Sequence, residues 1–172
     1  MLRVPLTQAH GGPVETVGTI DLDDPVFEGL DVQIVQPVEF EGRFSGAGDE
    51  KYYWRVKFST MVRAQCRRCL ADVEVPIAES RGLIFAADDE TPEGDGCYVI
   101  PPRTQVLDLR EPLREEIFLA VPHFVECRSD CKGLCPRCGA NLNDGPCSCP
   151  PPSDPRWEAL RSLPTADTPK KD

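Results

Sequence analysis

The stretch YYWRVKFSTMVRA, residues 52–64, decides the fold of this chain. Its odd positions include the basic residues Arg55, Lys57 and Arg63, and its even positions are mostly apolar: Tyr52, Trp54, Val56, Phe58, Thr60, Val62 and Ala64. Because successive side chains of a strand point to opposite faces, this period of two predicts a β-strand with one buried face. The basic residues then share its solvent face.

Looser alternation on both sides of this stretch predicts further strands. Apolar residues recur before it at Val32, Ile34, Val38, Phe40 and Phe44, and after it at Val73, Val75 and Ile77. Residues 46–49, Gly-Ala-Gly-Asp, are turn formers between two of these segments. Three or more antiparallel strands follow from this pattern.

Residues 105–122, QVLDLREPLREEIFLAVP, predict the main helix. Asp108 is a candidate cap, with Glu111 three residues later, although the helix can instead begin with Pro112 at its first position. One face carries Leu109, Leu113, Ile117 and Val121, which leaves Arg114, Glu115 and Glu116 on a solvated outer face. We therefore predict an α+β fold: an antiparallel β-sheet, as a meander or partly closed barrel, with one main helix and a C-terminal zinc-knuckle segment.

Six of the nine cysteines fall within residues 127–149, CRSDCKGLCPRCGANLNDGPCSC. The preferred metal ligands are two pairs with short chelate spacing: Cys135, Cys138, Cys147 and Cys149. Four thiolates close the coordination sphere of a zinc ion and leave no position for a reactive water. The segment contains little apolar material, so the metal would supply its folding energy.

The ligand assignment remains open, because six cysteines exceed four ligands. Cys127 and Cys131 can replace one pair, or can join Cys66 and Cys69 at a second site. The simpler interpretation of the Cys66-x-x-Cys69 step is a turn that buries two small thiols, and metal binding is the alternative. A disulfide framework would need an oxidising compartment, and an iron–sulfur cluster is the alternative cofactor to zinc.

Length and composition predict one domain with an appendage. The chain has 172 residues, of which 40% are hydrophobic. We predict a core domain at 1–126, a cysteine-rich metal-binding segment at 127–149 and a proline-rich, partly disordered tail at 150–172. The N-terminus lacks the apolar region of a secretory signal, and no apolar run reaches membrane-spanning length. We therefore expect a soluble, cytoplasmic protein.

The charge is negative overall but unevenly distributed. The net charge is −10, which gives no general support for nucleic-acid binding. Residues 51–71 nevertheless contain six basic residues and no acid before Ala71, whereas residues 88–95 form an acidic loop with Asp88, Asp89, Glu90, Glu93 and Asp95. Ordinary solvated surface explains both runs; the alternative is that Arg55, Lys57, Arg63, Arg67 and Arg68 contact RNA or another partner.

Three motifs, in this order, resemble a known family. They are CRRCL at residues 66–70, DLREPLREEIFLAVP at 108–122 and CRSDCKGLCPRCGANLN at 127–143. This combination resembles the bacterial and plastid large ribosomal RNA accumulation proteins, in their cysteine-rich version, over about residues 32–157. The resemblance implies a non-enzymatic role in the accumulation or maturation of large-subunit (23S) rRNA. The family is not uniform in its last cysteine block, so a metal there is not its whole mechanism.

Two functions follow as hypotheses. The first is a ribosome-biogenesis factor that contacts large-subunit rRNA or its precursor through the basic strand face and the zinc knuckle. The second is an acidic protein-binding module that escorts a basic ribosomal protein. An enzyme is not expected, because the chain has no phosphate-binding or metalloprotease motif and has only two histidines, His10 and His123.

Overall fold

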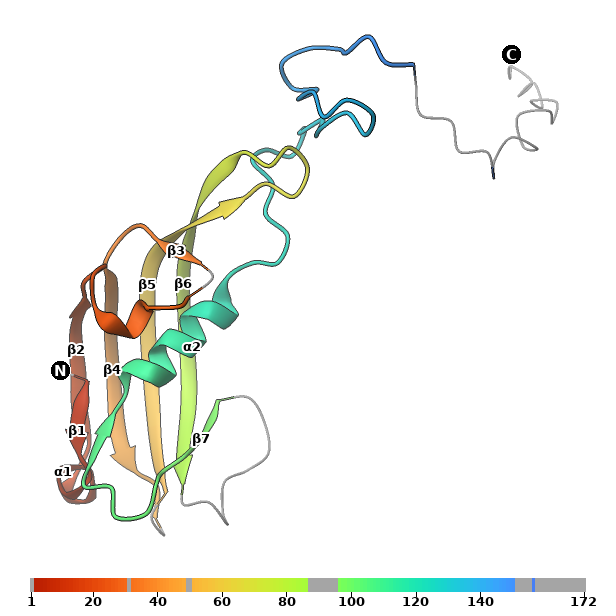
Figure 1. Cartoon of the computed structure of the whole chain (residues 1–172). Helices are drawn as coiled ribbons and strands as arrows, with labels where there is room; N and C mark the ends of the chain where they lie inside the picture. Colours follow the sequence, from red (N-terminus) through yellow and green to blue (C-terminus); the bar gives the residue numbers. More distant parts are fainter. Residues whose placement is uncertain (1, 31, 49–50, 87–95, 151–155, 157–172) are drawn as a thin grey trace, which may run out of the picture.

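The computed structural model describes residues 2–30, 32–48, 51–86, 96–150 and 156. Its centre is an open six-stranded sheet with the order β2-β4-β5-β6-β7, and β3 pairs with β5 off this path (Figure 1). The strands are β2 Val14–Ile20, β3 Gln33–Ile34, β4 Val38–Gly46, β5 Tyr52–Gln65, β6 Asp72–Ala86 and β7 Cys97–Val99. The predicted antiparallel sheet is confirmed. One pair, β6 with β7, is parallel and was not predicted.

The β5–β6 hairpin is the longest feature of the sheet. Its two strands pair from Tyr52 opposite Phe85 to Gln65 opposite Asp72. Along β5 the even positions from Tyr52 to Val62 are buried, and the odd positions between them are exposed or half-buried. The period of two therefore places one face of the hairpin in the core, and the hairpin carries the turn at residues 66–71 to the end of the sheet.

The helix α2, Arg110–Ala120, covers the buried face of the sheet (Figure 1). Leu109, Leu113 and Ile117 are fully buried, as their spacing predicted. The helix begins at Arg110, between the two starts that the pattern allowed, because residues 106–108 form strand β8, Val106–Asp108, which pairs with β1, Arg3–Pro5. Leu109 is the N-cap residue, although an Asp108 side-chain oxygen accepts a hydrogen bond from the Arg110 N–H at 3.1 Å.

The N-terminal residues contribute to the core, which the sequence pattern did not indicate. They form β1, a short helix α1, Leu6–Gly11, the edge strand β2 and a 3-10 turn η1, Pro25–Phe27. In β2, Thr16 is fully buried and its hydroxyl accepts a hydrogen bond from the Trp54 indole N–H at 2.8 Å. The buried indole N–H is thereby satisfied, as a polar group in a core requires.

One prediction about α2 is wrong: Glu116 is not on a solvated face. Its side chain is 5% exposed and lies 3.2 Å from the Nε of Arg81 on β6. The Tyr98 hydroxyl donates a hydrogen bond to it at 3.3 Å. Burial raises the pKa of Glu116, and Arg81 and Tyr98 oppose that rise. A buried carboxylate persists here because β6 supplies the compensating cation.

Some predicted features lie outside the described residues. These are the acidic residues 88–95, the turn residue Asp49 and the proline-rich tail apart from Pro150 and Arg156. Within the described part of the chain, no helix has the length and apolar character needed to cross a membrane.

Candidate metal centres

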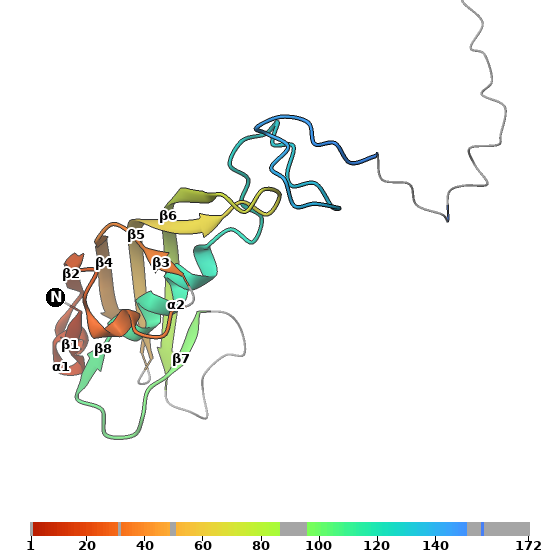
Figure 2. The same cartoon turned by 45° about the horizontal axis from the view of Figure 1, so that its top comes forward.

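Eight of the nine cysteines gather into two groups. Figures 1 and 2 show the backbone of the segment after α2 passing the turn of the β5–β6 hairpin and continuing beyond the end of the sheet. The first site consists of Cys66, Cys69, Cys127 and Cys131, and the second site consists of Cys135, Cys138, Cys147 and Cys149. Within each site the four Sγ atoms all lie within 4.8 Å of one another. Either group could therefore hold a metal ion.

The sulfur separations in the first site fit a tetrahedral ion. The Sγ atoms of Cys66 and Cys131 are 3.9 Å apart, and those of Cys69 and Cys127 are 3.6 Å apart. A zinc–sulfur bond of about 2.3 Å places the corners of a regular tetrahedron about 3.8 Å from one another. All nine cysteines of the chain are free thiols, so no disulfide competes for these atoms.

The first site joins two distant parts of the chain. The turn between β5 and β6 provides Cys66 and Cys69, and the segment after α2 provides the other two cysteines. The Arg67 amide donates a hydrogen bond to the Val125 carbonyl at 2.9 Å. The Arg67 guanidinium pairs with Glu126 at 2.9 Å and lies 5.0 Å from the centre of the Phe124 ring. These contacts hold the segment after α2 against the hairpin turn.

Both sites begin with the same six-residue turn. We call residues 66–71, CRRCLA, the first knuckle and residues 135–140, CPRCGA, the second knuckle; both read C-x-R-C-x-A. In each, the amide of the first cysteine donates to the carbonyl of the final alanine at 2.8 Å. The residue after the second cysteine has a left-handed conformation, with φ of 60° at Leu70 and 72° at Gly139.

The knuckle backbone favours the thiolate of the first cysteine. Backbone N–H groups of Cys127, Cys69 and Arg68 lower the pKa of Cys66 to about 6 against the effect of burial. Backbone N–H groups of Cys138 and Arg137 lower the pKa of Cys135 to about 6 in the same way. The lowered pKa of both thiols favours the thiolate, which is the form that binds a metal.

The two sites touch each other. The Leu134 amide, just before the second knuckle, donates to the Arg68 carbonyl in the first knuckle at 3.0 Å. The Leu134 side chain packs against a small buried cluster of first-site thiols, Cys66, Cys69 and Cys131. A side chain from the second-site loop, Asn143, donates to the Cys131 sulfur at 3.4 Å and lowers the pKa of that thiol.

The predicted basic residues lie in two separate places, the open sheet face and the first knuckle. Arg55, Lys57 and Arg63 are exposed on the sheet face opposite α2, where Lys57 pairs with Glu41 and Arg63 with Glu74, each at 3.3 Å. Arg67 and Arg68 are exposed on the first knuckle. Among the residues that the structure describes, Arg55 and Arg68 have no ion-pair partner.

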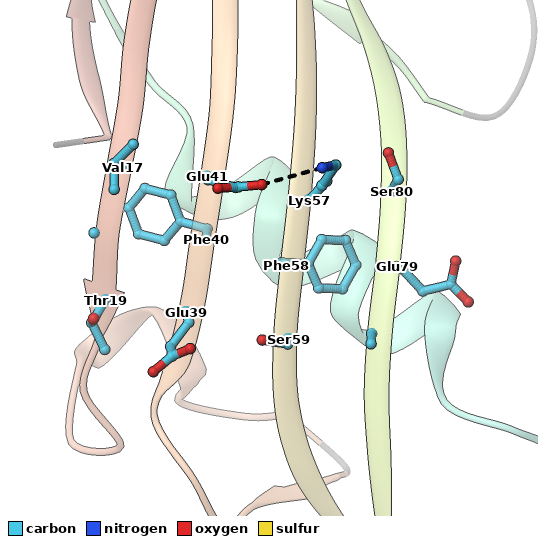
Figure 3. A pocket seen from close by; sticks show the side chains of 12 residues that line it. Val17, Thr19, Glu39, Phe40, Glu41, Lys57, Phe58, Ser59, Glu79 and Ser80 are labelled. Atoms are coloured by element: carbon cyan, nitrogen blue, oxygen red, sulfur yellow. Dashed lines mark hydrogen bonds and ion pairs between the residues drawn. The ribbon is translucent and has the colours of Figure 1, made fainter.

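A shallow hollow of about 670 Å³ lies on that open sheet face (Figure 3). Strands β2, β4, β5 and β6 line it, with small side chains such as Ser59, Ala78 and Ser80. The Glu41–Lys57 pair crosses it and neutralises the charge of that lysine (Figure 3). The hollow therefore offers a mixed surface rather than a basic one.

Reasoning from the sequence did not decide how the cysteine pairs combine. The structure brings the four preferred ligands together, and it places Cys127 and Cys131 with Cys66 and Cys69, which was one of the two alternatives left open. The repeated C-x-R-C-x-A turn was a signal that the two C-x-x-C steps are equivalent. Asn143 carried no such signal, because an asparagine between turn formers is ordinary loop composition.

Comparisons with known proteins agree with the motifs. The family model of the large ribosomal RNA subunit accumulation protein YceD matches residues 54–164. An uncharacterized protein of Mycobacterium tuberculosis is 36% identical over 110 residues, which are 60% of this chain and 52% of that protein. The chain thus aligns with about half the length of this relative.

Two plant relatives carry the family name. The chloroplastic large ribosomal RNA subunit accumulation protein YCED homolog 1 of Arabidopsis thaliana is 32% identical over 88 residues, covering 45% of this chain and 27% of that protein. Its Zea mays counterpart is 34% identical over 64 residues, covering 37% and 22%. No solved structure matches the chain. Because the family match covers well over half of the chain and includes both cysteine sites and α2, the chain belongs to the YceD family of large ribosomal RNA subunit accumulation proteins.

Proposed function

We propose that each site holds one structural zinc ion. Four thiols complete a tetrahedral sphere, and soft thiolate ligands in this geometry select zinc over harder divalent ions. The iron–sulfur alternative is less compatible with the spacing, because irons joined by bridging sulfides hold opposite cysteines farther apart than 4.8 Å. A complete sphere also leaves no position for a substrate, which supports a non-enzymatic role.

We further propose that this chain supports the accumulation of large-subunit rRNA by contacting that RNA or its precursor. The observation that carries the proposal is the repeated C-x-R-C-x-A turn, which presents an exposed arginine at the same place in each knuckle, Arg68 and Arg137. Neither has an ion-pair partner among the described residues. A guanidinium free of carboxylates can bind phosphate oxygens through two N–H groups.

An exposed aromatic ring lies beside the first knuckle. Phe124 is 74% exposed, and one face of its ring carries the Arg67 guanidinium. Unpaired RNA bases stack on such rings and on arginine planes, with about 1 to 3 kcal/mol per base. Phosphate contacts and base stacking would then occur on one surface, which supports single-stranded RNA as the ligand.

The charge of the knuckle region limits how strongly it can bind RNA. The whole chain carries −10, yet residues 66–71 and 124–149 together carry five basic and three acidic side chains. Two zinc ions with four thiolates each would add four negative charges to this module. RNA affinity would therefore depend on individual arginines rather than on a broad basic field, and would be modest and sensitive to salt.

The direct test is the binding of zinc-loaded full chain to large-subunit rRNA fragments, measured by fluorescence anisotropy across a salt series. The variant Arg68→Glu/Arg137→Glu should lower the affinity at least about 10-fold. The slope of log affinity against log salt concentration should fall by the amount expected for the loss of about two phosphate contacts. The matched control is Arg55→Glu/Lys57→Glu, which reverses the same charge on the sheet face and should have a much smaller effect.

Two results would contradict direct RNA contact through the knuckles. One is the absence of fragment binding at low salt by the zinc-loaded chain. The other is an equal loss of affinity in both double variants, which would mean that only total charge matters.

The alternative function is an escort for a basic ribosomal protein. The net charge of −10 favours it, because an acidic surface attracts a cationic partner. Affinity capture from cells would then enrich one basic ribosomal protein, and the enrichment would survive nuclease treatment. RNA recovered in place of that protein would favour the leading proposal.

A further inference from the structure

Asn143 belongs to the loop of the second site but contacts the first site. It lies between the second-site ligands Cys138 and Cys147. Its side-chain Nδ2 donates a hydrogen bond to the Sγ of Cys131, a first-site ligand, at 3.4 Å. A thiolate bound to a metal keeps negative charge on its sulfur, and an N–H donor stabilises that charge.

The orientation of the Asn143 amide is fixed by its other hydrogen bonds. Its Oδ1 accepts from the Lys132 backbone N–H at 2.8 Å and from the Arg128 guanidinium at 2.9 Å. Its Nδ2 also donates to Asn141 Oδ1 at 2.8 Å. A flipped amide would direct its NH₂ group at two donors, so the geometry requires Nδ2 to face the sulfur.

The loop that carries Asn143 depends on the second site for its shape. Residues 139–146, GANLNDGP, contain only Ala140 and Leu142 as apolar residues. The Leu142 amide donates to the Gly133 carbonyl at 2.9 Å, which docks the loop beside the first knuckle. The ligand pairs Cys135–Cys138 and Cys147–Cys149 flank it on both sides, so a metal bound there would fix both of its ends.

We propose that Asn143 couples the two metal sites. Metal binding at the second site orders the loop and places Nδ2 on Cys131, which raises the affinity of the first site. Because coupling between two binding equilibria is reciprocal, an occupied first site also raises the affinity of the second. The proposal rests on the metal sites proposed above and is independent of RNA binding.

The test is a double-mutant cycle on the full chain, with zinc affinity measured by competition against a chromophoric chelator. Asn143→Ala should weaken the first site about 10-fold, as is usual for lost outer-shell partners. Cys147→Ser/Cys149→Ser, which removes the second site, should weaken the first site to a similar degree. Asn143→Ala added to that double variant should then have less than about a 3-fold further effect.

Two further variants separate coupling from general damage to the loop. Asp144→Ala, an exposed neighbour, is the control and should leave both affinities unchanged. Asn143→Asp keeps the oxygen that Lys132 and Arg128 need but removes the donor to sulfur, so it should weaken the first site at least as much as Asn143→Ala. In cadmium-loaded protein, the Asn143 variants should also shift the cadmium NMR resonance of the first site. That resonance is the signal that remains in Cys147→Ser/Cys149→Ser.

Several outcomes would overturn the proposal. If Asn143→Ala weakens the first site equally with and without the second site, Asn143 acts alone and the sites are not coupled. Wild-type affinity in Asn143→Asp would exclude the donation to sulfur. If the unmodified chain binds less than two equivalents of metal, both the proposed sites and their coupling fail, whatever the RNA result.

Discussion

The two cysteine sites share one local design and differ in what they connect. The first site joins cysteines 65 and 58 residues apart along the chain, whereas the second is assembled within residues 135–149. A cross-link restricts the unfolded chain more when it closes a longer loop. With metal bound, the same knuckle would therefore stabilise the whole fold at the first site and shape only a short loop at the second.

The two sites also differ in how deeply their cysteines are buried. Each site has one exposed cysteine, Cys127 or Cys138, but the other three are buried at the first site, whereas at the second only Cys135 is buried. A ligand or oxidant in solution therefore reaches the second site more readily.

The largest expected effect comes from removing equivalent knuckle cysteines, Cys66→Ser and Cys135→Ser. Loss of the first site should lower Tm by more than about 10 °C, because the hairpin loses its link to the segment after α2. Loss of the second should lower Tm by only a few degrees. Thermal unfolding followed by circular dichroism provides the measurement, and equal shifts would remove the distinction between the sites.

Metal release should also occur in two phases. Elemental analysis should give two equivalents of zinc in protein purified without added metal. An excess of chelator should then remove one equivalent at least about 10-fold faster than the other, since the second site is more exposed. In Cys135→Ser the fast phase should disappear. Its persistence in that variant would assign the labile metal to the first site and contradict the comparison.

The residue after the second cysteine of each knuckle differs between the sites, leucine in the first and glycine in the second, and each can be replaced to test its effect. Leu70 has φ of 60° although it is not glycine, and its side chain is 57% exposed. A left-handed conformation costs a non-glycine residue about 1 kcal/mol, partly offset by the greater freedom of glycine in the unfolded chain. Leu70→Gly should therefore stabilise the fold by about 0.5 kcal/mol in urea unfolding.

The reverse change tests the second knuckle. A Cβ at Gly139 would meet nothing within 4 Å, so Gly139→Ala introduces backbone strain without a steric clash. It should weaken zinc binding at the second site several-fold and leave the first unchanged. Loss of affinity at both sites would instead show that the knuckles do not respond independently.

The smallest expected effect concerns Asp108, which makes folding stability depend on pH independently of the cysteine sites. The Arg110 side chain, 2.6 Å away, lowers the pKa of Asp108. The folded pKa lies below the unfolded value of about 3.9, so this stabilisation is present above that pH and is lost as the pH falls through the folded pKa.

Asp108→Asn should therefore cost less than about 1 kcal/mol at pH 7, because the pair is partly exposed, and almost nothing near pH 2. Urea unfolding of both proteins at the two pH values is the measurement. Both lose zinc alike in acid, so their difference isolates the carboxylate. A difference that does not change with pH would exclude the ion pair as its cause.

The strands that the sequence predicted are those whose buried face is mostly apolar. Residues 52–64 alternate cleanly, so β5 and its neighbours could be recognised. Strand β2 was missed because its inward-facing positions include the buried Thr16 and the half-buried Gly18, which weaken the period of two. Glu116 was placed on the wrong side of α2 because its partner, Arg81, lies on another element and is invisible to helical periodicity.

Local spacing likewise identified the group of Cys135, Cys138, Cys147 and Cys149 but left open which pair joins Cys66 and Cys69. A C-x-x-C step determines two adjacent ligands, since both lie on one turn. Which other pair completes the site depends on where α2 directs the chain, and that direction is set by packing of Leu109, Leu113 and Ile117. The ligand roles of all eight cysteines remain predictions until metal is measured.

The separation of the first-site cysteines also sets an order of events during synthesis. The chain emerges at about 5 to 20 residues per second, so Cys131 follows Cys66 by about 3 to 13 seconds. During that interval the hairpin thiols have no complete partner set and are open to oxidation. The first site therefore cannot be completed before Cys131 has been synthesised. The supply of metal to the newly made chain would then decide whether the site forms before its thiols are oxidised.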